Sequence, residues 1–476
     1  MFTADGTVLV FDYLRVPYRH GDRPAGGVPD GFAAVSPTGS SERRWLWPRQ
    51  APGGPLDRSG IVGEYLYAGS RIFGHVIPDD AMVSMLGAGW HADEAVTDVH
   101  GLAAASVWRH ESGSICLPFD PAEAIVAFWS EAYHGIRNAR HTYGPSRTVR
   151  LYYQIRPLVP RSIQIAVRRA YARRSARTEF PRWPFEPALH DLVRNLYRIA
   201  CEVAGEPVPW IAPWPAPFHW AFVLTHDVET AAGYARIGDL QAIEASLGYR
   251  SSWNLVARRY PVEDRLVAEL ERAGCEVGVH GLYHDGRDLA SREMLDARLP
   301  EMHEHAARWG AVGFRSPATQ RRWDLMAQLD FDYDSSYPDT DPYEPQPGGS
   351  CSWLPYHIGD VVELPITLPQ DHTLFVILQR SDPQAWIEKA GMLRSRGGMA
   401  LVLTHPDYLK DDATRQWYRG LLEAFAGDES AWRALPREVS DWWRRRAASE
   451  LVRDGDGWSI RGPAAEESAI TFEAPC

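Results

Sequence analysis

The 476-residue sequence predicts an α/β fold built on a parallel sheet, and three observations support that prediction. Apolar runs such as residues 220–225 are continuous, as is typical of strands buried on both faces. These runs alternate with helical patterns up to residue 405, as in repeated β-α units. Polar clusters follow several runs, at the positions where parallel strands bring side chains together. We expect the sheet either to close as a barrel or to remain open and doubly wound.

The strands and helices of this domain are expected in regular alternation. Each strand is a short apolar run, and each helix shows apolar residues at a spacing of three or four. Strands are expected at 220–225, 251–256, 276–280, 312–315, 331–336, 361–367, 373–378 and 399–405, and helices at 237–247, 262–274, 291–309 and 383–398.

The region before this domain, residues 1–145, is predicted to be an N-terminal α+β accessory module. Gly- and Pro-rich loops separate short apolar runs, and we expect strands at 7–14, 64–69 and 73–77. No catalytic constellation is apparent there.

One helix of this module has a clear start signal. Asp120 is placed to be the N-cap, Pro121 the first helical residue and Glu123 the capping-box partner. Apolar residues on one face indicate that this helix packs on a core.

Residues 146–204 are expected to hold an Arg-rich helix and a Pro/Trp linker. The stretch 161–177 carries six arginines, so it either makes a peripheral membrane contact or holds solvated or ion-paired charges. The motif EFPRWPFEP (179–187) favours a stiff linker. The parallel-sheet domain is then expected at 205–446, and a C-terminal β hairpin at 447–476.

Charge and composition exclude several classes of protein. The net charge is −12, which opposes a phosphate backbone, so no nucleic-acid partner is expected. The five cysteines form no C-x-x-C pair, which favours a reducing compartment and argues against a thiolate metal site. Neither a basic leader nor a long apolar run is evident, so we predict a cytoplasmic protein.

Four polar clusters follow predicted strands, and together they contain the residue types of a catalytic metal site. Two histidines four residues apart plus a carboxylate make a three-ligand site with one open position. The spacing alone is weak evidence in a chain with 17 histidines, whereas the shared location at strand ends is strong evidence. The clusters are LTHDVE (224–229), HGLYHD (280–285), GFRSP (313–317) and LTHP (403–406).

Each candidate in these clusters also has a structural alternative. His280 and His284 share a face if their turn is helical, or else they only form hydrogen bonds. Asp227 and Glu229 point to one side if the chain stays extended, but an acidic residue there can also cap a helix. Arg315 could instead anchor the end of a strand, and His405 could instead be a histidine packed in the core.

In their order along the chain, the motifs T-H-D-V-E, H-G-L-Y-H, R-S-P and L-T-H-P resemble those of the polysaccharide deacetylases. This family is the NodB-homology domain of carbohydrate esterase family four. The resemblance covers about residues 205–445 and implies a distorted (β/α)7 barrel. It also implies a divalent metal, Zn²⁺ or else Co²⁺, Ni²⁺ or Fe²⁺, and removal of acetyl groups from sugars.

The resemblance also implies a role for each residue. The family motif has two adjacent aspartates, a base and then a metal ligand, whereas here Asp227 is followed by Val228. Asp227 then falls on the base and Glu229 becomes the ligand through a one-residue bulge; in the alternative assignment the two acidic roles are exchanged. The remaining assignments are His280 and His284 as ligands, Arg315 as the residue that orients Asp227, and His405 as the acid that protonates the leaving amine.

Other residues are candidates for contact with the sugar. Tyr283, Pro317, Asp371 and His372 are expected to line the pocket, while Trp253, Trp323 and Trp353 either stack on a sugar or belong to the core. The leading hypothesis is a metal-dependent N-deacetylase acting on a glycan or glycolipid precursor. Two alternatives stay open, namely hydrolysis of another C–N bond, as in a small cyclic amide, and a degenerate carbohydrate-binding or scaffold protein.

Overall fold

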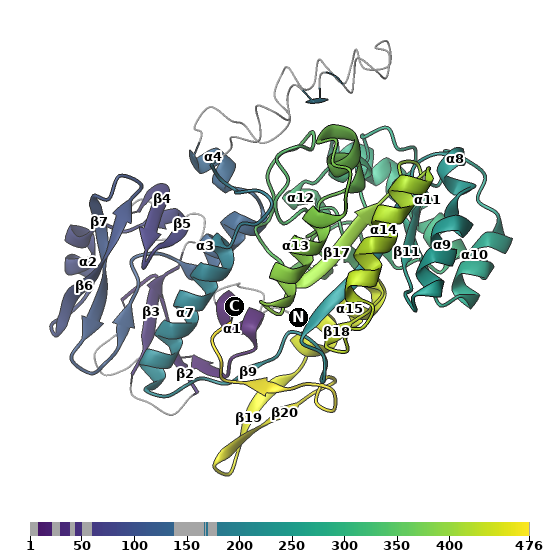
Figure 1. The fold of residues 1–476 in the computed structure, drawn as a ribbon. Coiled ribbons are helices and arrows are strands. Elements are labelled where there is room, and N and C mark those ends of the chain that lie inside the picture. The colour runs from purple at the N-terminus through teal and green to yellow at the C-terminus, as the bar shows by residue number, and fades with distance from the viewer. Residues whose placement is uncertain are drawn as a thin grey trace. The chain divides into compact units, whose positions relative to one another are not determined.

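A computed structural model of the chain describes residues 8–20, 29–38, 43–49, 60–137, 166, 168–169 and 179–475. The chain forms two compact units, and its mixed α/β class is as predicted (Figure 1). The first unit comprises Met1–Tyr143, Pro187–Pro215 and Arg445–Cys476, and the second comprises Gly144–Glu186 and Ala216–Arg444. Pro187–Pro215 and the tail Arg445–Cys476 thus group with the N-terminal residues.

The first unit contains an eight-stranded sheet in the order β1-β2-β3-β8-β7-β6-β4-β5. Neighbouring strands are antiparallel except for the parallel pair β3–β8. The strands are β1 (Tyr18–His20), β2 (Phe32–Pro37), β3 (Trp45–Pro48), β4 (Ile61–Tyr67), β5 (Ser70–Val76), β6 (Trp90–Asp98), β7 (Ala103–His110) and β8 (Ile115–Cys116).

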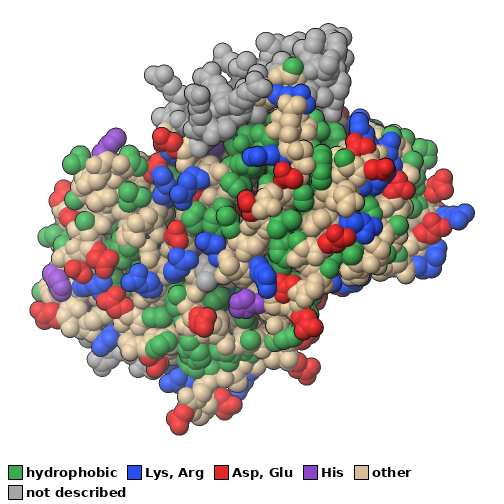
Figure 2. Space-filling view, viewed as in Figure 1, with side chains coloured by type: hydrophobic (Ala, Val, Ile, Leu, Met, Phe, Trp, Pro, Cys, Tyr) green, Lys and Arg blue, Asp and Glu red, His purple; other side chains and the backbone are tan. Residues whose placement is uncertain are grey.

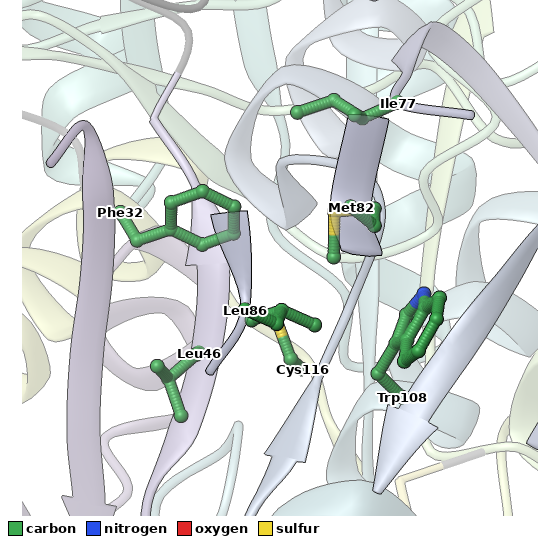
Figure 3. Close-up of a cluster of buried hydrophobic side chains, with 7 residues drawn as sticks. All are labelled: Phe32, Leu46, Ile77, Met82, Leu86, Trp108 and Cys116. Atoms are coloured by element: carbon green, nitrogen blue, oxygen red, sulfur yellow. The ribbon is translucent and has the colours of Figure 1, made fainter. Parts of the chain in front are cut away.

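An apolar cluster joins helix α2 (Asp79–Met85) to this sheet. Figure 3 shows its side chains facing one another, and all of them are buried. Burial raises the pKa of the Cys116 thiol, so this cysteine acts as a small apolar core residue. The cluster consists of Phe32, Leu46, Ile77, Met82, Leu86, Trp108 and Cys116.

The expected strand at 7–14 is wrong, because helix α1 (Leu9–Leu14) forms there instead. All six residues of α1 are buried, so the run carries no periodicity that separates a strand from a helix. The helix ends at Arg15, whose backbone adopts the left-handed conformation with φ 59°.

Helix α3 (Pro121–Trp129) begins as predicted, with the Asp120 side chain accepting a hydrogen bond from the Ala122 N–H at 2.8 Å. The expected capping box is wrong. Glu123 instead accepts the His75 N–H at 3.0 Å, and its other oxygen lies 2.6 Å from His75 Nδ1. A neighbouring strand thus binds the carboxylate in place of the helix N-terminus.

The remaining elements of the first unit include part of the predicted linker and the tail. Helix α4 (Tyr133–Arg137) follows α3, and helix α7 (Ala188–Ala204) contacts β5 and β2. In the tail, β19 (Glu450–Asp454) pairs with β20 (Gly457–Arg461) in antiparallel fashion. The last apolar run forms β21 (Ile470–Thr471), which pairs with β9 (Trp210–Ile211) rather than with the hairpin.

The second unit contains a sheet in the order β15-β16-β14-β13-β12-β11-β10-β17, with β18 paired to β10. All neighbours are parallel except β15 and β16. The strands are β10 (Trp220–Val228), β11 (Ser252–Leu255), β12 (Glu276–Val279), β13 (Gly313–Phe314), β14 (Tyr333–Asp334), β15 (Tyr356–Ile358), β16 (Val361–Glu363), β17 (Met399–Thr404) and β18 (Ala431–Trp432).

The segment that follows β16 lies against β17, at the other end of this strand order. The Leu368 N–H donates to the Leu401 carbonyl at 3.0 Å. The Thr367 hydroxyl donates to the Met399 carbonyl at 2.6 Å and accepts the Leu401 N–H at 2.8 Å. The segment after β16, the strand next to the far end of the order, is thereby bonded to β17 through residues 367 and 368.

Helices connect the parallel strands, as the sequence predicts. Helix α11 has the Ser291 side chain as its N-cap, and helix α14 has a capping box made by Asp411 and Thr414. The helices are α8 (Ala231–Tyr234), α9 (Ile237–Ser246), α10 (Asp264–Arg272), α11 (Arg292–Trp309), α12 (Trp323–Met326), α13 (Gln384–Arg394), α14 (Asp412–Phe425) and α15 (Pro436–Ala447).

The expected strand at 373–378 is wrong, because His372–Ile377 forms a π-helical segment. Asp371 caps its first turn by accepting the His372 N–H at 2.7 Å. An apolar run of this length fits a buried helical turn as well as a strand, so periodicity does not decide between them.

On the face shown in Figure 2, acidic and basic side chains are interspersed. Every helix in the described ranges is too short or too polar to span a bilayer. The Arg-rich stretch 161–177 lies outside the described residues apart from positions 166, 168 and 169, so the proposed membrane contact stays a prediction.

Candidate active site

All four polar clusters lie at the carboxyl ends of parallel strands. Strand β10 ends at Val228, β12 at Val279, β13 at Phe314 and β17 at Thr404. Strands β10 to β13 are consecutive in the sheet and β17 flanks β10, so these ends share one edge. Strand β10 is also longer than predicted. Asp227 therefore lies within the strand, next to its last residue, and pairs with Asn254 on β11.

Glu229, His280 and His284 come together at this edge. Their potential ligand atoms all lie within 4.8 Å of one another. Glu229 Oε1 is 3.0 Å from His284 Nε2. Burial opposes ionisation of Glu229, but the neighbouring histidines, His284 and then His405 foremost, together outweigh it and hold the pKa of Glu229 well below its usual value. The carboxylate is therefore ionised and available as a ligand.

His280 is oriented toward this cluster by a backbone contact. Its Nδ1 donates to the Arg315 carbonyl at 3.0 Å, which leaves Nε2 facing Glu229 and His284. Burial lowers the pKa of His280 to about 4, so the ring is neutral. Its Nε2 is buried and has no hydrogen-bond partner in the part of the chain that the structure describes. A neutral, unsatisfied imidazole nitrogen fits a metal ligand.

The turn between the two histidines is not helical, contrary to the expected shared helical face. Gly281 has φ 66° and His284 has φ 55°, both in the left-handed region. A Cβ on Gly281 would lie 2.3 Å from Asp288 Oδ2, so the turn requires glycine. This tight turn brings the imidazole ring centroids to 5.1 Å.

Asp227 lies beside the cluster and is held from one side. Its Oδ1 accepts from Asn254 Nδ2 at 2.9 Å and from Arg315 Nη1 at 3.2 Å. Its Oδ2 lies 3.6 Å from His280 Nε2. Burial alone would raise the pKa of Asp227, but the positive charges of Arg315 and His405 and the Asn254 hydrogen bond are among the contacts that together outweigh burial and lower it, so the carboxylate is ionised.

Arg315 is buried, and each of its three guanidinium nitrogens donates at least one hydrogen bond. Nε donates to the Ser335 carbonyl and Nη2 to the Ser335 hydroxyl, both at 2.7 Å. Nη1 donates to the Thr225 hydroxyl at 2.8 Å as well as to Asp227. These bonds join the ends of β10, β13 and β14 and fix the orientation of the Asp227 carboxylate.

His405 lies on the other side of Glu229, with Nε2 3.8 Å from Glu229 Oε1. Its Nδ1 is 2.7 Å from Asp371 Oδ1, and its backbone N–H donates to Asp371 Oδ2 at 2.7 Å. Burial opposes protonation, but the charge and hydrogen bond of Asp371 outweigh it and raise the pKa of His405 to about 10. The imidazole therefore carries a proton at neutral pH.

The residues expected to line a sugar pocket occupy different environments. Tyr283 is 45% exposed, with the Arg298 guanidinium 5.0 Å from its ring centroid. Asp371 is fully buried against His405, so it positions that histidine instead of facing solvent. His372 is buried, with its ring tilted against that of Tyr408 at a centroid distance of 4.9 Å, and Pro317 is buried beside the glycine turn.

The three tryptophans divide in the same way. Trp253 and Trp353 are buried, which matches the core alternative for both, and Trp323 at the start of α12 is half-buried. Two residues of the site were missed in the sequence, Asn254 and Ser335. Asn254 is a polar residue inside an apolar strand, which is the one signal that points to it.

No family model matches the chain, and no curated protein matches it. Among solved structures, a Mycobacterium smegmatis protein assigned as a polysaccharide deacetylase is 19% identical, with a TM-score of 0.40, over 49% of this chain and 93% of that one. A Puue allantoinase is 15% identical, with a TM-score of 0.39, over 48% and 92%. A family 4 carbohydrate esterase from Streptomyces lividans in complex with acetate is 12% identical, with a TM-score of 0.30, over 44% and 90%. The solved structures to which this chain is similar therefore include a protein assigned as a polysaccharide deacetylase and a family 4 carbohydrate esterase.

Proposed function

We propose that this chain is a metal-dependent hydrolase that removes acetyl groups from N-acetylated sugars of a glycan or glycolipid precursor. The observation that carries the proposal is the cluster of Glu229, His280 and His284 between an ionised Asp227 and a protonated His405. In this proposal the second unit is a distorted (β/α)7 barrel and the site opens at its carboxyl edge.

Glu229, His280 and His284 would hold one divalent ion. Two neutral imidazoles and one carboxylate are a donor set that suits Zn²⁺, and Co²⁺, Ni²⁺ and Fe²⁺ also bind such ligands. When bound, the ion polarises the acetyl carbonyl and makes water more acidic.

Asp227 is the general base in this proposal. Its Oδ1 is already occupied by Asn254 and Arg315, so Oδ2 is the oxygen available to accept a proton from the attacking water. The two donors keep the carboxylate in one orientation and keep it ionised, which general-base catalysis needs.

His405 is the general acid. An amine is a poor leaving group, so the C–N bond breaks only when a proton reaches its nitrogen. His405 carries that proton at neutral pH, and because Nδ1 is held by Asp371, Nε2 is the atom that delivers it. Because His405 carries the proton that an amine leaving group needs, we favour cleavage of an acetamide over cleavage of an acetate ester.

The test is release of acetate from a panel of N-acetylated mono- and oligosaccharides. The protein is stripped of metal and then reloaded with Zn²⁺ or Co²⁺. The control is the His280→Ala variant, which lacks one of the three proposed metal ligands. We expect acetate only from reloaded wild type. Metal uptake with cleavage of a cyclic amide but no acetate release would favour the alternative of a hydrolase acting on another C–N bond. Absence of both metal uptake and hydrolysis would favour the alternative of a carbohydrate-binding or scaffold protein. A carbohydrate partner and a cytoplasmic location are further parts of the proposal.

A further inference from the structure

The histidine of the first motif, His226, lies on the opposite face of β10 from Asp227. It is completely buried, and both ring nitrogens are engaged. Nε2 is 2.6 Å from Glu244 Oε1 on α9, and Nδ1 is 2.8 Å from the Thr404 hydroxyl on β17. The imidazole thus links the end of β17 to a helix that covers the sheet.

Glu244 is buried and fully bonded, which a buried carboxylate requires. Besides His226, it accepts the Ser251 hydroxyl at 2.5 Å and the Tyr418 hydroxyl at 2.7 Å. Burial and the Glu244 charge raise the pKa of Tyr418 well above its usual value, so Tyr418 remains a hydrogen-bond donor. These five residues, His226, Thr404, Glu244, Ser251 and Tyr418, form the His226 network.

The position of His226 in the sheet is what connects this network to the site. Its Cα partners in the parallel register are Trp253 on β11 and Thr404 on β17. The imidazole contacts both, because it stacks on Trp253 with ring centroids 4.1 Å apart and bonds to Thr404. The side chain of His226 on β10 therefore contacts the residue beside it on each of the two neighbouring strands, β11 and β17.

The next residue on each of these three strands belongs to the candidate site. Asn254 follows Trp253, Asp227 follows His226 and His405 follows Thr404. Because successive strand residues point to opposite faces, the network on the outer face lies directly behind the catalytic groups. A shift of β17 against β10 would change the separation between Asp227 and His405.

We propose that His226 is a positioning residue that keeps β10, β11 and β17 in register and so sets the separation between Asp227 and His405. The catalytic part of this inference rests on the proposed function. A buried charged network is weak evidence for stability, because apolar residues of similar size in its place often give the folded protein equal or greater stability. Its value here is to specify one register of three strand ends.

Three variants separate positioning from stability. His226→Phe keeps a ring over Trp253 but loses both hydrogen bonds, and Thr404→Val cuts only the link between β10 and β17. Tyr418→Phe is the matched control, because it removes one hydrogen bond from the same Glu244 without touching that link. All three leave the Glu229–His280–His284 cluster intact, so each should take up one Zn²⁺ per chain.

The first readout is catalysis at saturating Zn²⁺, after correction for the folded fraction. We expect His226→Phe and Thr404→Val to lower kcat about 10- to 100-fold with KM nearly unchanged, as for small misplacements of catalytic groups. Tyr418→Phe should keep wild-type kcat. Equal losses of kcat in all three variants, or no loss in His226→Phe, would overturn the positioning role.

The second readout is amide hydrogen exchange, which needs no substrate. We expect faster exchange at residues 226–229 and 403–405 in His226→Phe and Thr404→Val, with unchanged exchange in β12 and β13. If wild type releases no acetate, the proposed function fails, and this readout alone decides the inference. Unchanged exchange at both strand ends, or a uniform increase across the second unit, would refute the inference even with an active enzyme.

Discussion

Asp371 holds His405 at two points, because one carboxylate oxygen binds the ring Nδ1 and the other accepts the backbone N–H. The two contacts fix both the place of the histidine at the end of β17 and the direction of its ring. They also make Asp371 the strongest of the groups that raise the pKa of His405.

Replacing Asp371 should therefore change the pH dependence of the reaction. In Asp371→Asn the charge is lost and burial remains, so the pKa of His405 falls from about 10 and the neutral ring dominates at pH 8. We expect kcat at pH 8 to fall by ~10²–10⁴-fold and the alkaline limb of the rate profile to move to lower pH. Profiles of wild type and the exposed control Asp360→Asn should coincide, and an unshifted limb in Asp371→Asn would contradict this assignment.

Removing either histidine of the Glu229–His280–His284 cluster should abolish metal binding. His280→Ala or His284→Ala leaves two ligands, fewer than the three that a stable catalytic site needs, so bound metal should fall from about one ion per chain to near zero. Elemental analysis after gel filtration measures this. His91→Ala, an exposed histidine of the first unit, should retain the ion. Equal metal content in all of these proteins would show that the cluster is not the metal site.

The two acidic residues should separate in their effects. Asp227→Asn keeps the three ligands and should bind Zn²⁺ normally, yet lose ~10²–10⁴-fold in kcat. Glu229→Gln removes the charged ligand and should weaken Zn²⁺ binding. Zn²⁺ titration followed by turnover at saturating metal distinguishes them. The opposite pattern would exchange the two roles, and full activity in both variants would place the site elsewhere.

A buried ion pair gives a prediction about stability alone. Lys389 Nζ lies 2.7 Å from Asp339 Oδ2, and both side chains are buried. Lys389→Met leaves a buried carboxylate without its partner and should lower the free energy of unfolding by about 3–5 kcal/mol. Lys389→Met combined with Asp339→Leu should recover most of that loss. Urea denaturation of wild type, Lys389→Met, Asp339→Leu and the double variant measures these losses, and additive losses in the double variant would be inconsistent with this coupling.

The residues of the site were predictable from the sequence because they end strands. The four motifs follow apolar runs, and residue type plus location at one sheet edge suffices to bring Asp227, His280, Arg315 and His405 together. Their bonding partners were not predictable in the same way. Asn254 lies on β11, beside β10, and Ser335 follows β14, beside β13, so only the register of the sheet shows what they contact.

The errors have a common physical origin. The runs 7–14 and 373–378 were expected to be strands, but Leu9–Leu14 and His372–Ile377 form helical turns. All six residues of the first turn and four of the six in the second are buried, and burial on several sides weakens the periodicity on which the assignment depends. Glu123 had the right spacing for a capping box, but His75 from another strand competes for it. Tertiary contacts decided these cases, and no local pattern records them.

The hydrogen bonds from residues 367 and 368 to β17 also have a consequence for self-association. Both backbone groups of Leu401 are occupied, the N–H by the Thr367 hydroxyl and the carbonyl by the Leu368 N–H. An uncovered parallel strand at this position would be a template for a strand from another copy of the chain, the usual first contact in edge-to-edge aggregation. Capping β17 within its own chain thus protects the apolar strand that carries His405 from such pairing.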